Sequence, residues 1–223
     1  MNDSLGSSMS AKLTIEQMQA LAKAHVGRAP TRSAAPSYKR IRLRQGSDSW
    51  LSWRDNGIGA SDAPSIMGEN RWKSRTRLLD EKLGGVRSAQ NAAMAKGSAL
   101  EPDALKRFTK ETGIEAHPVC LESTRCSWLH ASLDGLSPDG KVVVEIKCGS
   151  SAYRHANKFR QPPTYYKGQL QHILAITGLS EIHYWNYLPG KDPIHLLVSR
   201  DEAYITRLFS EEQKFWKELV ARR

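Results

Sequence analysis

A carboxylate and an ammonium group lie two residues apart in a segment typical of a β-strand, KVVVEIKCGS at 141–150. Because side chains alternate along a strand, Glu145 and Lys147 share one face and the aliphatic residues beside them share the other. The sequence SPDG at 137–140 predicts a tight turn that brings Asp134 back beside them. A shift of one residue in this pairing would turn Asp134 to the opposite face, so the register decides whether the acids meet.

Two neighbouring carboxylates repel each other unless a cation joins them, and Mg²⁺ is a hard ion that binds oxygen ligands and keeps waters. We therefore interpret Asp134 and Glu145, with the main-chain carbonyl of Ile146, as candidate ligands for Mg²⁺, with Mn²⁺ as an alternative ion. Lys147 would orient or help to deprotonate a water, as in metal-assisted phosphodiester hydrolysis. The pattern alone also fits a half-exposed strand with a cross-strand salt bridge.

Glu101 is a further candidate metal ligand. It precedes Pro102 in the stretch GSALEPDALKRF, and proline is favoured at the first position of a helix. We therefore expect Glu101 at the start of a helical turn, where a third carboxylate would complete the metal site. Helix capping or compensation of the helix dipole is the simpler interpretation for this residue on its own.

The elements that must position these residues follow from hydrophobic periodicity and turn residues. Helices that end near a glycine are predicted at 49–55, 61–67, 74–83 and 89–112. Strands are predicted at 114–121, 128–133, 142–147, 181–187 and 194–198. Two further helices are predicted at 165–177 and 202–222. This order predicts an α/β fold with a mixed sheet.

The first 37 residues differ in composition from the rest. Residues 1–12 are rich in serine, residues 27–37 are rich in glycine, proline, serine and alanine, and the spacing of Thr14 and Gln17 predicts a short helix at 14–25. We expect a flexible or partly helical N-terminal arm over 1–37 and a single folded domain over 38–223.

The charge balance points to a polyanionic partner. The chain has 33 Lys and Arg against 23 Asp and Glu, a net charge of +10, which attracts DNA, RNA or acidic membranes. No apolar run approaches the roughly 20 residues that span a bilayer. Three cysteines without a C-x-x-C pair, and an N-terminus unlike a secretory signal, predict a reducing, cytoplasmic location.

Five stretches that occur in order resemble the phage lambda-type alkaline exonucleases, a branch of the PD-(D/E)XK nucleases also called YqaJ-like viral recombinases. They are WLSWRDNGIGASD (50–62), GSALEP (97–102), SLDG (132–135), EIKC (145–148) and YKGQLQ (166–171). A looser likeness extends from about residue 45 to residue 219. The chain departs from the family at Leu133, where the motif has proline, a structural rather than a chemical difference.

The resemblance implies a PD-(D/E)XK (restriction-endonuclease-like) core, a central mixed β-sheet flanked by helices. It implies a Mg²⁺-dependent exonuclease that degrades one strand of linear double-stranded DNA from the 5′ end as a homotrimer. By position, Asp134 and Glu145 would bind the metal, Lys147 would assist the attacking water and Glu101 would be the helix acid. It also implies a phage or prophage gene in a bacterial host and a single-strand annealing protein as partner in recombination.

The same resemblance predicts a pocket for the 5′-phosphate. An arginine forks onto phosphate oxygens, and Ser61 at a helix start would add N–H donors for an anion. Taken singly, these residues also fit a surface charge, an N-cap, a strand residue or a solvated helix residue, and Trp50 fits a core position as well as a stacking one. The candidate phosphate and DNA contacts are Arg54, Ser61, Ser132, Gln169, Tyr166, Gln171 and Trp50.

Two other functions remain compatible with these residues. One is a different PD-(D/E)XK nuclease, either an endonuclease or a single-strand exonuclease. The other is a non-catalytic DNA-binding module that uses only the basic surface, for which Mg²⁺-dependent turnover is not expected.

Overall fold

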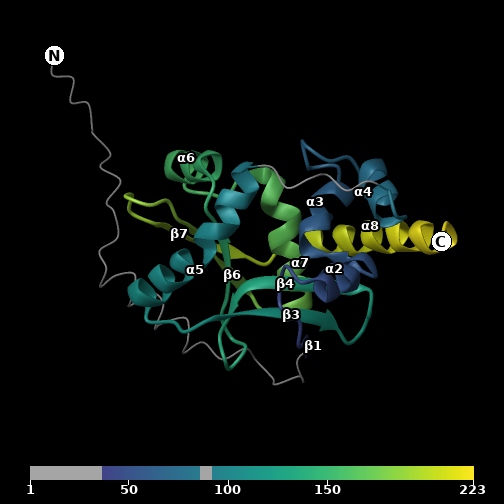
Figure 1. The fold of residues 1–223 in the computed structure, drawn as a ribbon, viewed down its shortest axis with the longest axis horizontal. Helices are drawn as coiled ribbons and strands as arrows, with labels where there is room; N and C mark the ends of the chain where they lie inside the picture. Colours follow the sequence, from purple (N-terminus) through teal and green to yellow (C-terminus); the bar gives the residue numbers. More distant parts are fainter. Residues whose placement is uncertain (1–36, 86–91) are drawn as a thin grey trace, which may run out of the picture.

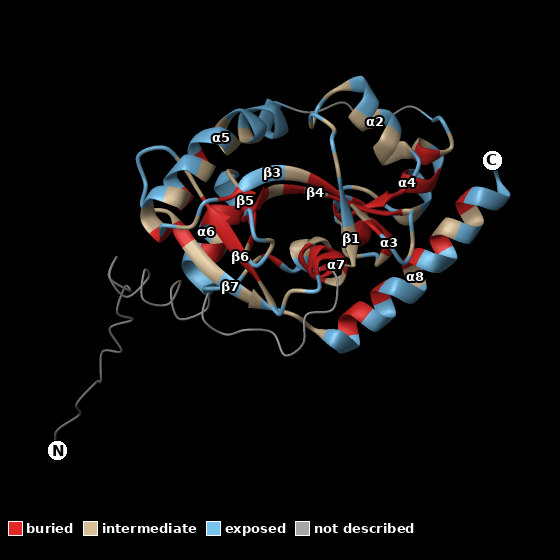
Figure 2. Cartoon of the chain, turned by 90° about the horizontal axis from the view of Figure 1, so that it is seen from below, coloured by how far each residue is buried: buried red, intermediate tan, exposed pale blue. Residues whose placement is uncertain are grey.

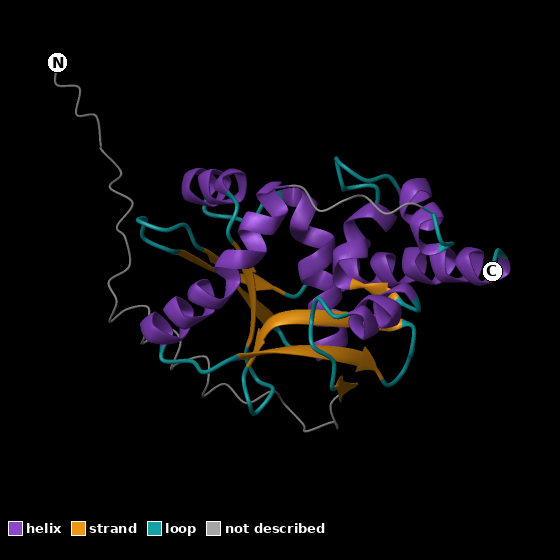
Figure 3. Ribbon diagram, in the orientation of Figure 1, coloured by secondary structure: helices purple, strands orange, loops and turns teal. Residues whose placement is uncertain are grey.

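The computed structural model describes residues 37–85 and 92–223. The expected N-terminal arm with its helix at 14–25, and the first residues of the helix expected at 89–112, lie outside this part. The described part has a central mixed sheet flanked by helices, so the predicted α/β fold is confirmed (Figures 1 and 3). None of the described helices is long and apolar enough to cross a membrane.

The sheet has the strand order β1-β3-β4-β5-β6-β7, and a short strand β2 also pairs with β4. Neighbouring strands are antiparallel except for the parallel pairs β5–β6 and β2–β4. The strands are β1 (Tyr38–Ile41), β2 (Ile58–Gly59), β3 (His117–Ser123), β4 (Leu129–Leu136), β5 (Val143–Lys147), β6 (Glu181–Asn186) and β7 (Ile194–Ser199).

The helices cover both faces of this sheet. They are α2 (Asp48–Asp55), α3 (Ala63–Ile66), α4 (Arg75–Lys82), α5 (Ala92–Thr112), α6 (Ser150–Phe159), α7 (Lys167–Thr177) and α8 (Glu202–Ala221), with 3₁₀ turns η1 (Ala60–Asp62) and η2 (Thr164–Tyr166). Helix α7 is buried along most of its length, whereas α5 and α8 expose one side to solvent (Figure 2).

The strand β5 separates two packing environments. Its residues Val144 and Ile146 pack with Phe108 of α5, whereas Val143 belongs to the larger core that includes α7. The alternation along β5 therefore points Glu145 and Lys147 away from α5.

Helix α7 comes close to α3 at Gly168, where an added Cβ would lie 3.0 Å from the main-chain nitrogen of Pro64.

The register of β4 and β5 brings the two predicted acids together. Gly135 pairs with Val144, and Leu136 pairs with Val143. Continuing this register by one position places Asp134 opposite Glu145. The predicted turn at 137–140 is present, because the amide of Gly140 donates to the carbonyl of Ser137 at 2.9 Å.

Several elements differ from their predicted form. The strand expected at 128–133 continues to Leu136, and β1, β2 and α6 were not predicted. Pairing of β1 with β3 stabilises a short segment, YKRI, that has little strand pattern of its own. Helix α6 has only alanines and one tyrosine on its buried side, namely Ala152, Tyr153 and Ala156.

Candidate active site

Glu145 is the most deeply buried acid of the site, with 2% of its surface exposed. Its Oε1 accepts hydrogen bonds from Lys147 Nζ at 2.5 Å and from Gln169 Nε2 at 2.6 Å. Its Oε2 is buried and has no hydrogen-bond partner among the described residues. A buried carboxylate oxygen without a partner is costly, so this atom is suited to accept a cation or a ligand donor.

Asp134 faces Glu145 from β4. Its Oδ2 accepts the main-chain amide of Ile146 at 2.7 Å, which fixes the carboxylate against β5. Burial raises the pKa of Asp134 well above its usual value, and the negative charges of Glu145 and Glu101 raise it further. Both effects disfavour ionisation of Asp134, and a positive charge bound beside these acids would favour it.

Glu101 lies within α5, near the same group of charges. Burial raises the pKa of Glu101; Lys147 opposes this effect and Glu145 adds to it. The described part of the helix predicted at 89–112 is present as α5, but the expectation that Glu101 stands at the start of a helical turn with Pro102 at its first position is wrong, because Pro102 lies inside α5. Proline lacks the amide that would bond to the preceding turn, so Pro102 interrupts the helix ladder next to Glu101.

Lys147 remains charged in this environment. Burial alone would lower the pKa of Lys147, but the charge of Glu145, with Tyr166 and Asp134, raises it above the usual value. Its ammonium nitrogen lies 4.7 Å from the centre of the Tyr166 ring. A lysine held in the ammonium form orients and neutralises groups, and this environment favours that function over removal of a proton from water.

The acids fit a magnesium ion better than a closed metal cluster. Among the described residues, no group of three His, Cys, Asp or Glu side chains is placed to hold a metal. Mg²⁺ usually binds through one or two carboxylates and keeps several waters, so a third protein acid is not required. Asp134, the unpartnered Oε2 of Glu145 and the carbonyl of Ile146 supply suitable hard oxygen atoms.

The predicted phosphate residues form a second group of contacts. Arg54 Nη2 donates to Ser61 Oγ at 2.7 Å, and Trp50 Nε1 donates to Ser132 Oγ at 2.8 Å. The guanidinium carbon of Arg54 lies 4.6 Å from the centre of the Trp50 ring, which joins the two pairs. Gln169, the fourth residue predicted for the phosphate pocket, donates its amide to Glu145.

Two details of the predicted DNA-binding set are wrong. Ser61 does not begin a helix; it lies inside the 3₁₀ turn η1, and α3 follows with only four residues. Gln171 is 2% exposed and bonds to the connection between β7 and α8, through the carbonyl of Ser199 and the amide of Asp201. Gln171 therefore stabilises the packing of α7 and does not line the site.

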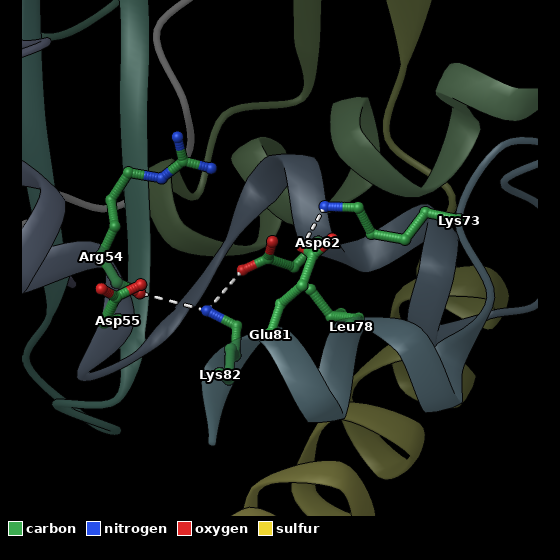
Figure 4. Close-up of a pocket in the computed structure, with 7 residues that line it drawn as sticks. All are labelled: Arg54, Asp55, Asp62, Lys73, Leu78, Glu81 and Lys82. Atoms are coloured by element: carbon green, nitrogen blue, oxygen red, sulfur yellow. Dashed lines mark hydrogen bonds and ion pairs between the residues drawn. The ribbon is translucent and has the colours of Figure 1, made fainter. Parts of the chain in front are cut away.

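Sequence reasoning missed a charged pair next to the phosphate residues. Lys82 Nζ lies 2.9 Å from Asp62 Oδ2, and both side chains are almost completely buried. They line a cavity of about 150 Å³ together with Arg54 (Figure 4). Asp62 belongs to the GIGASD motif, but a single lysine at the end of α4 carries no signal that distinguishes it from a surface charge.

Comparison with known proteins identifies relatives of this chain. Residues 49–180 match the family model of the YqaJ-like viral recombinase domain. The protein YqaJ of Bacillus subtilis (strain 168) is 28% identical over 179 residues, which make up 78% of this chain and 56% of that protein. The chain thus spans little more than half the length of this relative.

Solved structures resemble the described fold. The alkaline exonuclease LHK-Exo from Laribacter hongkongensis is 27% identical with a TM-score of 0.69, over 78% of this chain and 93% of that one. Its complex with dAMP has a TM-score of 0.70 over the same shares of the two chains. A phage-related exonuclease from Haemophilus somnus 129PT, at 15% identity and a TM-score of 0.54, shares the fold over 74% of this chain and 95% of that one.

The family match covers more than half of the 223 residues and contains all five motif stretches, from the segment at 50–62 to the segment at 166–171. Strand β5 and the beginning of α7, which carry Glu145 and Gln169, lie inside it. The chain belongs to the YqaJ-like viral recombinase domain family.

Proposed function

We propose that this protein is a Mg²⁺-dependent exonuclease that degrades one strand of linear double-stranded DNA from its 5′ end. The observation that carries the proposal is the state of Glu145, whose Oε1 is held by Lys147 and Gln169 while the buried Oε2 has no partner among the described residues. The likeness to the alkaline exonuclease LHK-Exo supports the same reaction class.

The residues of the site have different roles in the proposed phosphodiester hydrolysis. Asp134, Glu145 and the Ile146 carbonyl would hold Mg²⁺, which would supply a Lewis acid for the scissile phosphate. Gln169 and Lys147 hold Glu145 in one orientation, and the Ile146 amide holds Asp134. The Lys147 ammonium is placed to orient the attacking water and to offset negative charge that develops on the phosphate.

The group around Arg54 is suited to hold the 5′-phosphate of the strand end. Its guanidinium presents several donors in a planar fork, and Ser61 and Ser132 add hydroxyl donors near it. The relative LHK-Exo has been solved with dAMP, a nucleoside monophosphate of the kind that such a cleavage releases. Retention of the phosphorylated end between successive cleavages would make the digestion processive.

The partners follow from the family and are part of this proposal. A homotrimeric ring would keep the undigested strand in its channel, and a single-strand annealing protein would take up that strand for recombination. The net charge of +10 suits a protein that encloses or contacts DNA. Mn²⁺ is expected to replace Mg²⁺ because it accepts the same hard oxygen ligands.

Digestion of linear and closed circular duplex DNA with Mg²⁺ tests this function. The linear duplex is expected to disappear while the circle survives, and Lys147→Ala is expected to be inactive. Lys214→Ala, on the exposed side of α8, is the matched control and should behave as the unchanged protein. Equal cleavage of circle and linear DNA would favour the endonuclease, and binding without any cleavage would favour the non-catalytic module.

A further inference from the structure

Lys82 is a buried lysine whose three hydrogen-bond donors are all used. Its ammonium contacts Asp62 Oδ2 at 2.9 Å, the carbonyl of Gly57 at 2.7 Å and the carbonyl of Arg54 at 3.1 Å. Only 6% of its side chain is exposed. Figure 4 shows this ammonium reaching into the segment that carries Arg54 and Asp62, with Lys73 and Glu81 paired in the same cavity.

The partner of this lysine is an anion beside the phosphate group of contacts. Asp62 follows Ser61 directly, and its Oδ2 also accepts the amide of Gly59 at 2.9 Å. Burial would raise the pKa of Asp62, but the charges of Lys82 and Arg54 outweigh burial and lower it. Arg54 is therefore attracted to Asp62 as well as to any phosphate, and Lys82 competes for the same carboxylate.

We propose that Lys82 is a positioning residue of the 5′-phosphate pocket, where it neutralises Asp62 and leaves Arg54 free to bind phosphate. The inference rests on the proposed function and names a residue that acts on the pocket through another side chain. Removal of the Lys82 charge leaves the buried Asp62 carboxylate uncompensated next to Arg54. This carboxylate would draw the guanidinium of Arg54 away from the phosphate, and it would also repel the phosphate itself. Removal of the Asp62 charge should then undo the damage.

The test compares cleavage of duplex ends that carry 5′-phosphate with ends that carry 5′-hydroxyl. The ratio of kcat/KM for the two ends should fall about tenfold in Lys82→Met, since a charge-assisted contact to phosphate is weakened. The ratio should return toward the original value in the double variant Lys82→Met with Asp62→Asn. Asp62→Asn and Lys82→Arg alone should keep the preference, and Lys214→Met is the matched surface control.

The outcomes separate this proposal from a structural role and from failure of the proposed function. If the double variant is no better than Lys82→Met, or if Asp62→Asn loses the preference as well, Lys82 serves only the architecture of the segment and the proposal is overturned. Cleavage by the unchanged protein without end preference overturns the phosphate pocket and this inference with it. Lack of any cleavage by the unchanged protein overturns the proposed function itself.

A separate observation concerns an exposed tryptophan between α3 and α4. Trp72 is 66% exposed and contacts the edge of Tyr165, with ring centres 4.9 Å apart. The guanidinium of Arg71 lies 5.6 Å from the Trp72 ring centre. An exposed aromatic ring with an adjacent cation has the composition of a site on which nucleic-acid bases stack.

This tryptophan is linked to the catalytic lysine through a series of ring contacts. Tyr165 lies 4.6 Å from Tyr166, and the Lys147 ammonium lies 4.7 Å from the Tyr166 ring, in each case measured to ring centres. We infer that Trp72 and Tyr165 form a stacking site for unpaired bases of the DNA strand next to the active site. DNA is favoured over an apolar partner because the Arg71 guanidinium lies against the Trp72 ring and supplies a positive charge there.

Binding of a fluorescent single-stranded oligonucleotide, measured without metal so that no cleavage contributes, tests this stacking site. Trp72→Ala should weaken binding roughly fivefold or more, and Trp72→Phe, which keeps an aromatic face, should retain most of the affinity. The matched control is Phe159→Ala, because Phe159 is 51% exposed and also lies beneath a lysine, Lys158. Equal losses in both alanine variants, or a Trp72→Ala variant that binds normally but assembles differently, would overturn the stacking site.

Discussion

Gln169 at the beginning of α7 donates its amide to Glu145 on β5 over 2.6 Å. The bond joins a helix to the sheet at the position where the acids meet, and it acts on the oxygen that Lys147 also contacts. Glu145 is therefore oriented from two elements at once. If Glu145 binds Mg²⁺ as proposed, Gln169 and Lys147 would support the metal site without touching the ion.

Replacement of Gln169 should weaken the metal site without unfolding the protein. For Gln169→Ala we expect a loss of activity of about 10- to 100-fold at low Mg²⁺, the usual effect of removing a residue that orients a metal ligand. Activity should partly recover at high Mg²⁺. A titration of the cleavage rate with Mg²⁺ measures it. Gln213→Ala, on an exposed position of α8, is the matched control. An unchanged Mg²⁺ dependence in Gln169→Ala would show that this bond does not orient Glu145.

Asp134→Asn should abolish cleavage and stabilise the metal-free protein. The folded-state pKa of Asp134 is raised, so its favourable contribution is present below the unfolded pKa and is lost as pH rises through the folded pKa. At pH 8 the buried Asp134 carboxyl therefore destabilises the metal-free fold, and asparagine removes that cost while it can still accept the Ile146 amide.

Thermal unfolding at pH 8 measures this effect. The Tm of Asp134→Asn without Mg²⁺ should exceed that of the unchanged protein by about 2–4 °C, the shift expected for roughly 1 kcal/mol in a domain of this size. Added Mg²⁺ should raise the Tm of the unchanged protein and leave that of the variant almost unchanged. A lower Tm for the variant without metal would contradict the conclusion that the buried Asp134 carboxyl destabilises the metal-free protein.

The activity should rise with pH and depend on the Mg²⁺ concentration. Asp134 and Glu101 both have raised pKa values, in each case because of burial first and neighbouring acids next. Protons compete with the cation for these carboxylates, so more Mg²⁺ should move the acidic limb of the rate profile to lower pH. The rate is measured across pH at a low and at a high Mg²⁺ concentration. Identical profiles at both concentrations would contradict the placement of the metal on these acids.

A buried pair remote from the acids should control stability. His172 Nδ1 lies 2.6 Å from Glu212 Oε1, and Nε2 lies 2.9 Å from the carbonyl of His130. Both partners are acceptors, so both ring nitrogens must donate and the imidazole is protonated. Burial would lower the pKa of His172, but the charge and hydrogen bond of Glu212 outweigh burial and raise it.

Glu212→Ala should therefore destabilise the protein by about 3 kcal/mol or more, because it leaves a buried histidine without its carboxylate. A raised folded-state pKa contributes stability that is present below the unfolded pKa, about 6.5, and is lost as pH rises through the folded value. Urea unfolding should thus show a larger difference from the unchanged protein at pH 6 than at pH 9. Glu211→Ala, half-exposed on the same helix, is the control.

The sequence predicted the parts of this fold that depend on local pattern and on short motifs. The alternation of β5 predicted which residues share a face with Glu145, and the turn at 137–140 is where it was expected. The pairing of Asp134 with Glu145 depends on a register of β4 and β5 that strand periodicity leaves open by one residue. Helix α6 was missed because its buried side is made mostly of alanine.

Two features of the site could not be predicted from the sequence motifs. Gln171 belongs to the same short motif as Gln169, yet α7 turns it into the core, because two residues along a helix place side chains on different sides. Lys82 was missed because its function depends on contacts with Arg54, Gly57 and Asp62, which are more than 15 positions away in the chain and carry no common pattern. Such tertiary contacts become visible only in the structure.

The direction of digestion tests the central claim most directly. A linear duplex labelled on one strand at either its 5′ or its 3′ end is incubated with the protein and Mg²⁺, and released mononucleotides are followed over time. The proposed function predicts that the 5′ label is released at once as a mononucleotide, while the 3′ label stays in long fragments until late. Early release of the 3′ label, or internal fragments from both substrates, would contradict it.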